Sequence, residues 1–147
     1  MNLKVKKLNS EALLPTRNKP TDAGLDLYAL EDTFIPLGET RTIDTGVAFE
    51  TPVGFVTKIE DRSSLASKGL RTGAGVIDSG YTGPIKVVIH NLTNKDGSMN
   101  MVRGYIVHKG DKIAQALVYK VETPMVTEVS ELASSDRNEK GFGSSGR

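Results

Sequence analysis

The sequence contains no cysteine, and this absence excludes several classes of protein. No disulfide framework can form, no thiolate can bind a metal ion, and no cysteine can act as a catalytic nucleophile. Long apolar runs are missing too. Nowhere do 18 apolar residues follow one another, and the first seven residues, MNLKVKK, lack the apolar core of a secretion signal. We therefore expect a soluble, cytoplasmic protein.

An excess of charge of one sign is also lacking. The chain has 19 Lys and Arg residues against 18 Asp and Glu, for a formal net charge of +1. Such a balance gives no overall electrostatic attraction to nucleic acid or to a membrane, so neither is expected as a partner. Any site for an anion must be local. The length of 147 residues indicates one domain with a single core.

Helical periodicity is scarce, and short β-branched runs recur between Gly, Pro, Asn and Asp residues. This spacing is typical of sandwiches and barrels, and it predicts an all-β domain. One helical turn is expected over residues 64–68, with Gly69 ending it. The expected strands cover residues 4–8, 25–29, 40–44, 46–50, 55–60, 85–90, 105–108, 113–121 and 125–129.

The most informative run is residues 75–83, GVIDSGYTG, in which three glycines surround one carboxylate and one aromatic ring. Glycine provides positive φ and lets the main chain approach a ligand closely. The run then forms a pocket in which Asp78 and Tyr81 carry the chemistry. An ordinary β-hairpin with a solvated Asp78 explains the same nine residues.

Other polar residues lie at the ends and in the middle of expected strands. Arg62 precedes Ser63 and Ser64, and a serine N-cap beside an arginine forms an anion site of the helix-terminus kind. A plain serine cap beside a surface arginine is the alternative. Asp26 and Gln115 each interrupt an apolar run, where most such side chains are simply solvated.

The last fifteen residues, ASSDRNEKGFGSSGR, contain Phe142 as their one large apolar side chain. Such a segment cannot bury enough surface to order itself, so a frayed terminus is one interpretation. The other is a binding segment. Its glycine-rich backbone N–H groups, two serine hydroxyls, Arg137 and the Phe142 ring are the parts of a phosphate nest with a base-stacking platform.

Taken together and in order, five segments resemble the motifs of the trimeric deoxyuridine triphosphatase (dUTPase) family. The resemblance implies a jelly-roll or β-clip barrel over residues 1–132, with residues 133–147 as a mobile lid on the active site. It also implies a homotrimer with shared active sites that hydrolyses dUTP to dUMP and pyrophosphate with Mg²⁺, lowering dUTP and supplying dUMP for thymidylate synthesis. The five segments are residues 23–27, 62–66, 75–83, 110–115 and 137–146.

The resemblance also implies residue roles. Asp78 would orient and deprotonate the attacking water, and Asp26 would contact Mg²⁺ through water. Tyr81 would pack under the deoxyribose, hairpin main chain near Lys86 would pair with uracil, and Phe142 would stack on the base. The full set expected to bind substrate is Arg62, Ser63, Ser64, Gly75, Val76, Ile77, Tyr81, Lys86, Gln115, Arg137, Phe142, Gly143 and Ser144.

Two competing functions remain. A dCTP deaminase of the same fold needs an additional arginine and a glutamate, and this chain has Ser67 and Val88 at the corresponding positions. A regulatory nucleotide-binding protein of the dUTPase fold is the second alternative, with a protein partner expected at the loop 94–101. The chain also departs from the family at Gly80, where many members carry a second acidic residue.

Overall fold

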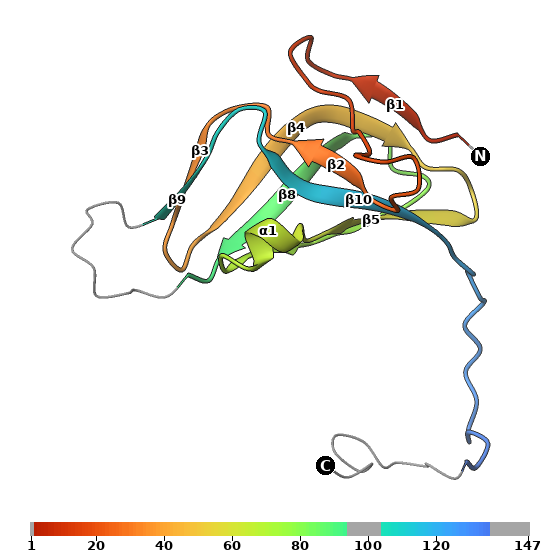
Figure 1. Ribbon diagram of the computed structural model, residues 1–147. Helices are drawn as coiled ribbons and strands as arrows, with labels where there is room; N and C mark the ends of the chain where they lie inside the picture. The colour runs from red at the N-terminus through yellow and green to blue at the C-terminus, as the bar shows by residue number, and fades with distance from the viewer. Residues whose placement is uncertain (1, 94–103, 136–147) are drawn as a thin grey trace.

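A computed structural model describes residues 2–93 and 104–135 of the chain (Figure 1). This part contains ten β-strands and one short helix. The expectation of an all-β domain with one short helix is confirmed. No helix within these ranges is long and apolar enough to cross a membrane. The elements are β1 Lys4–Lys7, β2 Leu25–Tyr28, β3 Thr33–Pro36, β4 Thr40–Glu50, β5 Phe55–Glu60, α1 Ser63–Ala66, β6 Leu70–Gly73, β7 Val76–Ile77, β8 Pro84–Asn91, β9 Gly104–Val107 and β10 Lys112–Lys120.

The strands form two four-stranded sheets and one two-stranded ribbon, all with antiparallel pairing. The first sheet has the order β1-β4-β8-β6, the second has the order β2-β10-β5-β7, and β3 pairs with β9. Both sheets contribute to a single buried cluster, for example Ile43 and Val87 from the first and Leu27 and Ile59 from the second. The fold is therefore a sandwich closed around one core.

Side-chain alternation explains which residues reach that core. In β8, Ile85, Val87 and Ile89 are buried while Lys86 between them is exposed, as the two-residue period of a strand requires. In β10 the register shifts between Lys112 and Ala114. Beyond this irregularity Ala114 and Ala116 point inward, and Gln115 between them is left on the outer face, where it is available to a ligand.

The expected strands 40–44 and 46–50 prove to be one continuous strand, β4. The register with β8 shifts between Asp44 and Ala48, so the chain bulges there without ending the strand. Gly46 takes up the bulge with a φ of +68°, and the buried Thr45 hydroxyl donates to the Ile85 carbonyl at 2.6 Å. A glycine that predicts a turn from sequence is thus used here to bend a strand.

Three short strands, β3, β6 and β7, were not expected, because each contains only two to four residues and lacks a long β-branched run. The expected strand 125–129 is wrong. Residues 121–135 are exposed, and residues 121–129 form no strand. Met125, Val126 and Leu132 are among the most exposed apolar side chains of the described part. Their β-branched and apolar composition favours pairing, but none of the described strands pairs with them.

Asn91 is the one amide side chain that is fully buried in the described core. Its Nδ2 donates to the Ile35 carbonyl at 2.9 Å, and its Oδ1 accepts from the Thr93 backbone N–H at 3.1 Å and the Thr93 hydroxyl at 2.6 Å. This amide ties the end of β8 to β3, and every buried polar atom involved has a partner.

Replacing Asn91 by Ala should therefore lower the free energy of unfolding by about 2 to 4 kcal/mol, because the Ile35 carbonyl and the Thr93 N–H lose a partner inside the core. Urea denaturation at one fixed protein concentration measures the change. Asn18→Ala, in an exposed loop, is the matched control and should shift stability by less than about 0.5 kcal/mol. Equal stabilities for the two variants would contradict the role given to the Asn91 amide.

Candidate active site

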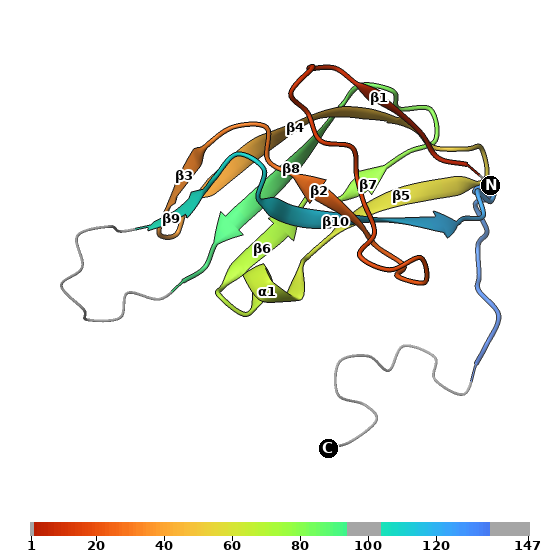
Figure 2. The ribbon, with the colours of Figure 1, turned by 45° about the horizontal axis from the view of Figure 1, so that its top comes forward.

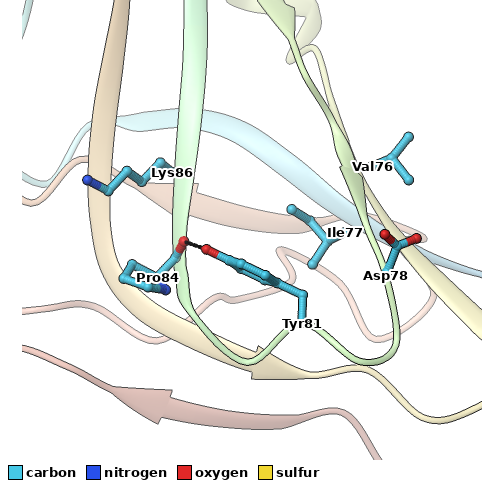
Figure 3. A pocket seen from close by; sticks show the side chains of 6 residues that line it. All are labelled: Val76, Ile77, Asp78, Tyr81, Pro84 and Lys86. Carbon is cyan, nitrogen blue, oxygen red and sulfur yellow. Dashed lines mark hydrogen bonds between the residues drawn. The ribbon is translucent and has the colours of Figure 1, made fainter.

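A cavity of about 270 Å³ lies between β7 and β8, beside the connection that joins them (Figure 3). The two strands belong to different sheets and do not pair with each other, so the β-hairpin expected over residues 75–83 is wrong. Its lining comes from the run that the sequence singles out, together with the start of β8. The Tyr81 side chain extends from the connection toward the start of β8, and its hydroxyl donates to the Pro84 carbonyl at 2.9 Å. The lining residues are Val76, Ile77, Asp78, Tyr81, Pro84 and Lys86.

Asp78 and Lys86 lie on opposite sides of this cavity (Figure 3). Asp78 directly follows β7, and Lys86 belongs to β8. The Asp78 carbonyl accepts a hydrogen bond from the Tyr81 N–H at 3.0 Å, which closes the turn and leaves the Asp78 carboxylate exposed. Lys86 faces Asp44 of β4, with its Nζ 3.9 Å from the carboxylate. The cavity thus combines an accessible carboxylate, an aromatic wall and main chain held by sheet pairing.

Two of the three glycines of the run, Gly75 and Gly83, serve close approach, and the expected positive φ is wrong, because none of the three lies in the left-handed region. A Cβ on Gly75 would overlap the Ile59 carbonyl oxygen, and one on Gly83 would overlap the Tyr81 ring. The residue with positive φ here is Ala74, at +50°. Gly80 has open space around it, so its position accepts a side chain without a clash.

A second group of functional side chains surrounds Asp26 of β2. Its Oδ1 lies 3.0 Å from Arg62 Nε, and its Oδ2 lies 2.7 Å from Lys112 Nζ. Arg62 Nη1 also donates to the Lys112 carbonyl at 3.1 Å. The hydrogen bond to Asp26 raises the pKa of Lys112 above its ordinary value, with burial opposing it. Asp26 therefore holds two cationic side chains, Arg62 and Lys112.

Gln115 lies beside this group because the register places it opposite Asp26 on one side and Glu60 on the other. Its Nε2 donates to the Asp61 carbonyl at 2.8 Å. A Cβ on Gly24 would collide with the Gln115 amide, so the glycine gives this side chain room where it lies beside the start of β2. The segments 23–27 and 110–115, far apart in sequence, thus meet here.

Helix α1 places Ser63 and Ser64 next to Arg62, but the expected serine N-cap is wrong. The N-cap residue is Arg62, in extended conformation, and it makes no side-chain capping hydrogen bond. Both serines are exposed, so their hydroxyls face outward beside the arginine. Gly69 ends this turn with a φ of +81°, as expected.

The two groups lie at opposite ends of β5 (Figure 2). Ile77 pairs with Thr57, and β7 runs antiparallel to β5. The next residue, Asp78, therefore lies closer to the start of β5. Arg62 follows the end of the same six-residue strand. At about 3.3 Å per residue, Asp78 and Arg62 of one chain are roughly 15 to 20 Å apart. They cannot act on one phosphorus atom within a single chain.

Sequence reasoning missed Lys112, Lys68 and Tyr105, which line a cavity of about 360 Å³ together with Arg62 and Ser64. Lys112 falls inside the segment 110–115 and was detectable there, whereas no local pattern marks Tyr105. Four expected site residues, Arg137, Phe142, Gly143 and Ser144, lie outside the described residues, as does the loop 94–101.

The donors fit a water-mediated magnesium ion. No group of three or more His, Cys, Asp or Glu side chains in residues 2–93 and 104–135 could hold a metal directly. A carboxylate offers about four lone-pair positions. The contacts with Arg62 and Lys112 engage one position on each Asp26 oxygen, so positions remain that can accept hydrogen bonds from metal-bound water.

The sequence profile of the dUTPase family matches residues 10–146. The deoxyuridine 5'-triphosphate nucleotidohydrolase of Helicobacter hepaticus is 42% identical over 149 residues, which cover 99% of this chain and 89% of that protein. A dUTPase variant of Staphylococcus bacteriophage 80alpha with dUpNHpp has a TM-score of 0.90 at 33% identity, covering 99% of each chain.

A second solved structure, a dUTPase variant of phage phi11 of S. aureus described with a structural Mg(II) ion, has a TM-score of 0.80 at 29% identity. That alignment covers 89% of this chain and 98% of the phage chain. The matched profile spans all five site segments, and the curated relative is similar over nearly the whole length of this chain. The chain belongs to the dUTPase family.

Proposed function

We propose that this member of the dUTPase family hydrolyses dUTP to dUMP and pyrophosphate at active sites assembled from neighbouring chains. The observation that carries the proposal is the separation of Asp78 from Arg62 and Gln115 along β5. One end offers a nucleoside-sized cavity with an accessible carboxylate. The other offers two fixed cations, two serine hydroxyls and an amide, which suit a polyphosphate.

The reaction is a displacement at the α-phosphorus. Asp78 accepts a proton from a water molecule, and the water oxygen bonds to phosphorus. The bond from the α-phosphorus to the oxygen that bridges it to the β-phosphorus breaks, and pyrophosphate leaves. A carboxylate is a weak base, so most of the acceleration must come from the position of the water and from neutralised phosphate charge.

Nucleotide choice is assigned to β7, the start of β8 and the connection between them. The Tyr81 ring is locked by its bond to the Pro84 carbonyl and so forms a fixed wall under the deoxyribose, where a 2′-hydroxyl would clash. Main chain of residues 75–77 and near Lys86 would pair with the uracil edge. Hydrogen bonds of this kind discriminate more strongly than apolar fit, because the wrong base leaves a buried polar group unpaired.

The phosphates are assigned to Arg62, Ser63, Ser64 and Gln115. Asp26 holds the Arg62 guanidinium through its Nε, and Nη1 donates to the Lys112 carbonyl, which leaves Nη2 for a phosphate oxygen. Mg²⁺ held by phosphate oxygens and water would neutralise charge on the triphosphate, and the free lone pairs of Asp26 would accept hydrogen bonds from its waters.

The shared site requires an oligomer, and we propose the homotrimer. Residues 121–135 carry Met125, Val126, Val129 and Leu132 away from the body with their side chains exposed. Burying each of them would contribute about 1.5 to 3 kcal/mol, which favours a neighbouring chain as their contact.

Asp78→Asn should lower kcat on dUTP at least about a hundredfold with a small change in KM, because the amide cannot accept the proton. Pyrophosphate release from dUTP, dCTP, dTTP and UTP, each with magnesium or with a chelator, measures the effect and the selectivity. Glu31→Gln, an exposed site with the same change of charge, is the control. Equal rates on dUTP for wild type and Asp78→Asn would refute the assignment.

Turnover by wild type also separates an enzyme from a purely regulatory nucleotide-binding protein.

Mixing two inactive variants tests the shared site. Asp78→Asn and Arg62→Gln, co-expressed with different affinity tags and purified through both, should regain activity. After purification through both tags only mixed trimers remain, and about one third of their sites receive an intact Asp78 and an intact Arg62 from different chains. Asp78→Asn mixed with the double variant Asp78→Asn/Arg62→Gln should regain none. Full activity of a monomer would be incompatible with shared sites. So would a mixture of Asp78→Asn and Arg62→Gln that regains no activity.

The segment 133–147 is proposed as the lid, with Arg137, Gly143 and Ser144 on the phosphates and Phe142 on the base. Ordering it costs about 1 to 2 kcal/mol for each residue, whereas stacking returns only about 1 to 3 kcal/mol. Phosphate contacts must therefore supply most of the closing energy. Trypsin cleavage after Arg137 should slow severalfold with dUpNHpp and Mg²⁺ but not with inorganic phosphate. The same cleavage rate in both would remove the lid from the proposal.

A further inference from the structure

The cavity of about 360 Å³ near α1 holds three cationic side chains, Arg62, Lys68 and Lys112. Two of them are already partnered, because Arg62 and Lys112 share the Asp26 carboxylate. Lys68 differs from both. Within residues 2–93 and 104–135 it has no carboxylate partner within ion-pair distance. A cation of this kind in a cavity is available to an anion from outside.

Lys68 is held in place in two ways. Its backbone N–H donates to the Leu65 carbonyl at 3.0 Å, and Gly69 then turns the chain with a φ of +81°. Its ammonium lies over the face of the Tyr105 ring, 5.6 Å from the ring centre. Tyr105 is fixed by β9, where it pairs with Ile35. The ring therefore attracts the ammonium without neutralising it.

We infer that Lys68 binds the two phosphates of dUTP that leave as pyrophosphate, and that Tyr105 is the positioning residue for its ammonium. The inference rests on the proposed function. The terminal phosphates carry most of the charge of a triphosphate, and the leaving group gains charge as the bond breaks. An unpaired ammonium with three N–H donors stabilises such a group more than a cation already bound to a carboxylate.

Lys68→Met should weaken binding of inorganic pyrophosphate about tenfold and raise KM for dUTP by a similar factor, since one charge-assisted contact is lost. Lys68→Arg should restore most of the affinity. Tyr105→Leu should weaken pyrophosphate binding about two- to fivefold, and Tyr105→Phe, which keeps the ring, should leave it unchanged. Isothermal titration with pyrophosphate reads binding without turnover, and initial rates give KM and kcat.

Lys7→Met on the exposed β1 is the matched control and should change neither quantity. Wild-type pyrophosphate affinity in Lys68→Met, with or without a lower melting temperature, would overturn the inference and leave Lys68 a structural role. If Lys68→Met does not fold, the pair Tyr105→Leu and Tyr105→Phe makes the same comparison without a change of charge, and equal affinities there would overturn it.

Failure of the proposed function looks different. A wild-type protein that binds pyrophosphate in a Lys68-dependent way but does not hydrolyse dUTP would keep the anion site and reject the enzyme. A wild-type protein that hydrolyses dUTP while Lys68→Met matches it in pyrophosphate affinity and KM would keep the enzyme and reject the role of Lys68.

Discussion

Strand β5 pairs with β10 along one edge and with β7 along the other, and this double pairing determines where each functional group lies. Pairing with β10 brings Gln115 and Asp26 to the end of β5 that leads into α1. Pairing with β7 places Asp78 and the connection that follows it toward the other end of β5. The six residues of β5 thus set the distance between Asp78 and Arg62 of one chain, and this distance cannot shrink while β5 stays paired with both neighbours.

Asp26 shows how one carboxylate can organise a binding surface that attracts anions. Alone, it would repel phosphate. Because it lies between Arg62 and Lys112, its single negative charge is outweighed by their two positive charges. Its main effect is to orient these two side chains. Arg62 is further fixed by the Lys112 carbonyl, so the guanidinium has little freedom left to lose when a ligand binds.

Much of this could be read from the sequence, and the failures have physical causes. Strand 55–60 and the motif residues were predictable because alternation and motif order are local signals. The merging of 40–44 with 46–50 was not, since Gly46 fits a turn or a bulge equally well until β8 pairs beside it. The strand expected at 125–129 failed because strand propensity alone does not supply a partner, and none of the described strands pairs with this segment. Tyr105 and Lys68 meet only through tertiary packing.

The opposite placement of Asp78 and Arg62 also has a genetic consequence. In a closed ring each chain would contribute Asp78 to one site and Arg62 to another. A chain that folds and assembles but is damaged at both ends would disable two sites of three, although only one chain in the ring is altered. Such an allele would act dominantly over the normal copy, whereas an allele that prevents folding would be recessive, because its product never enters the ring.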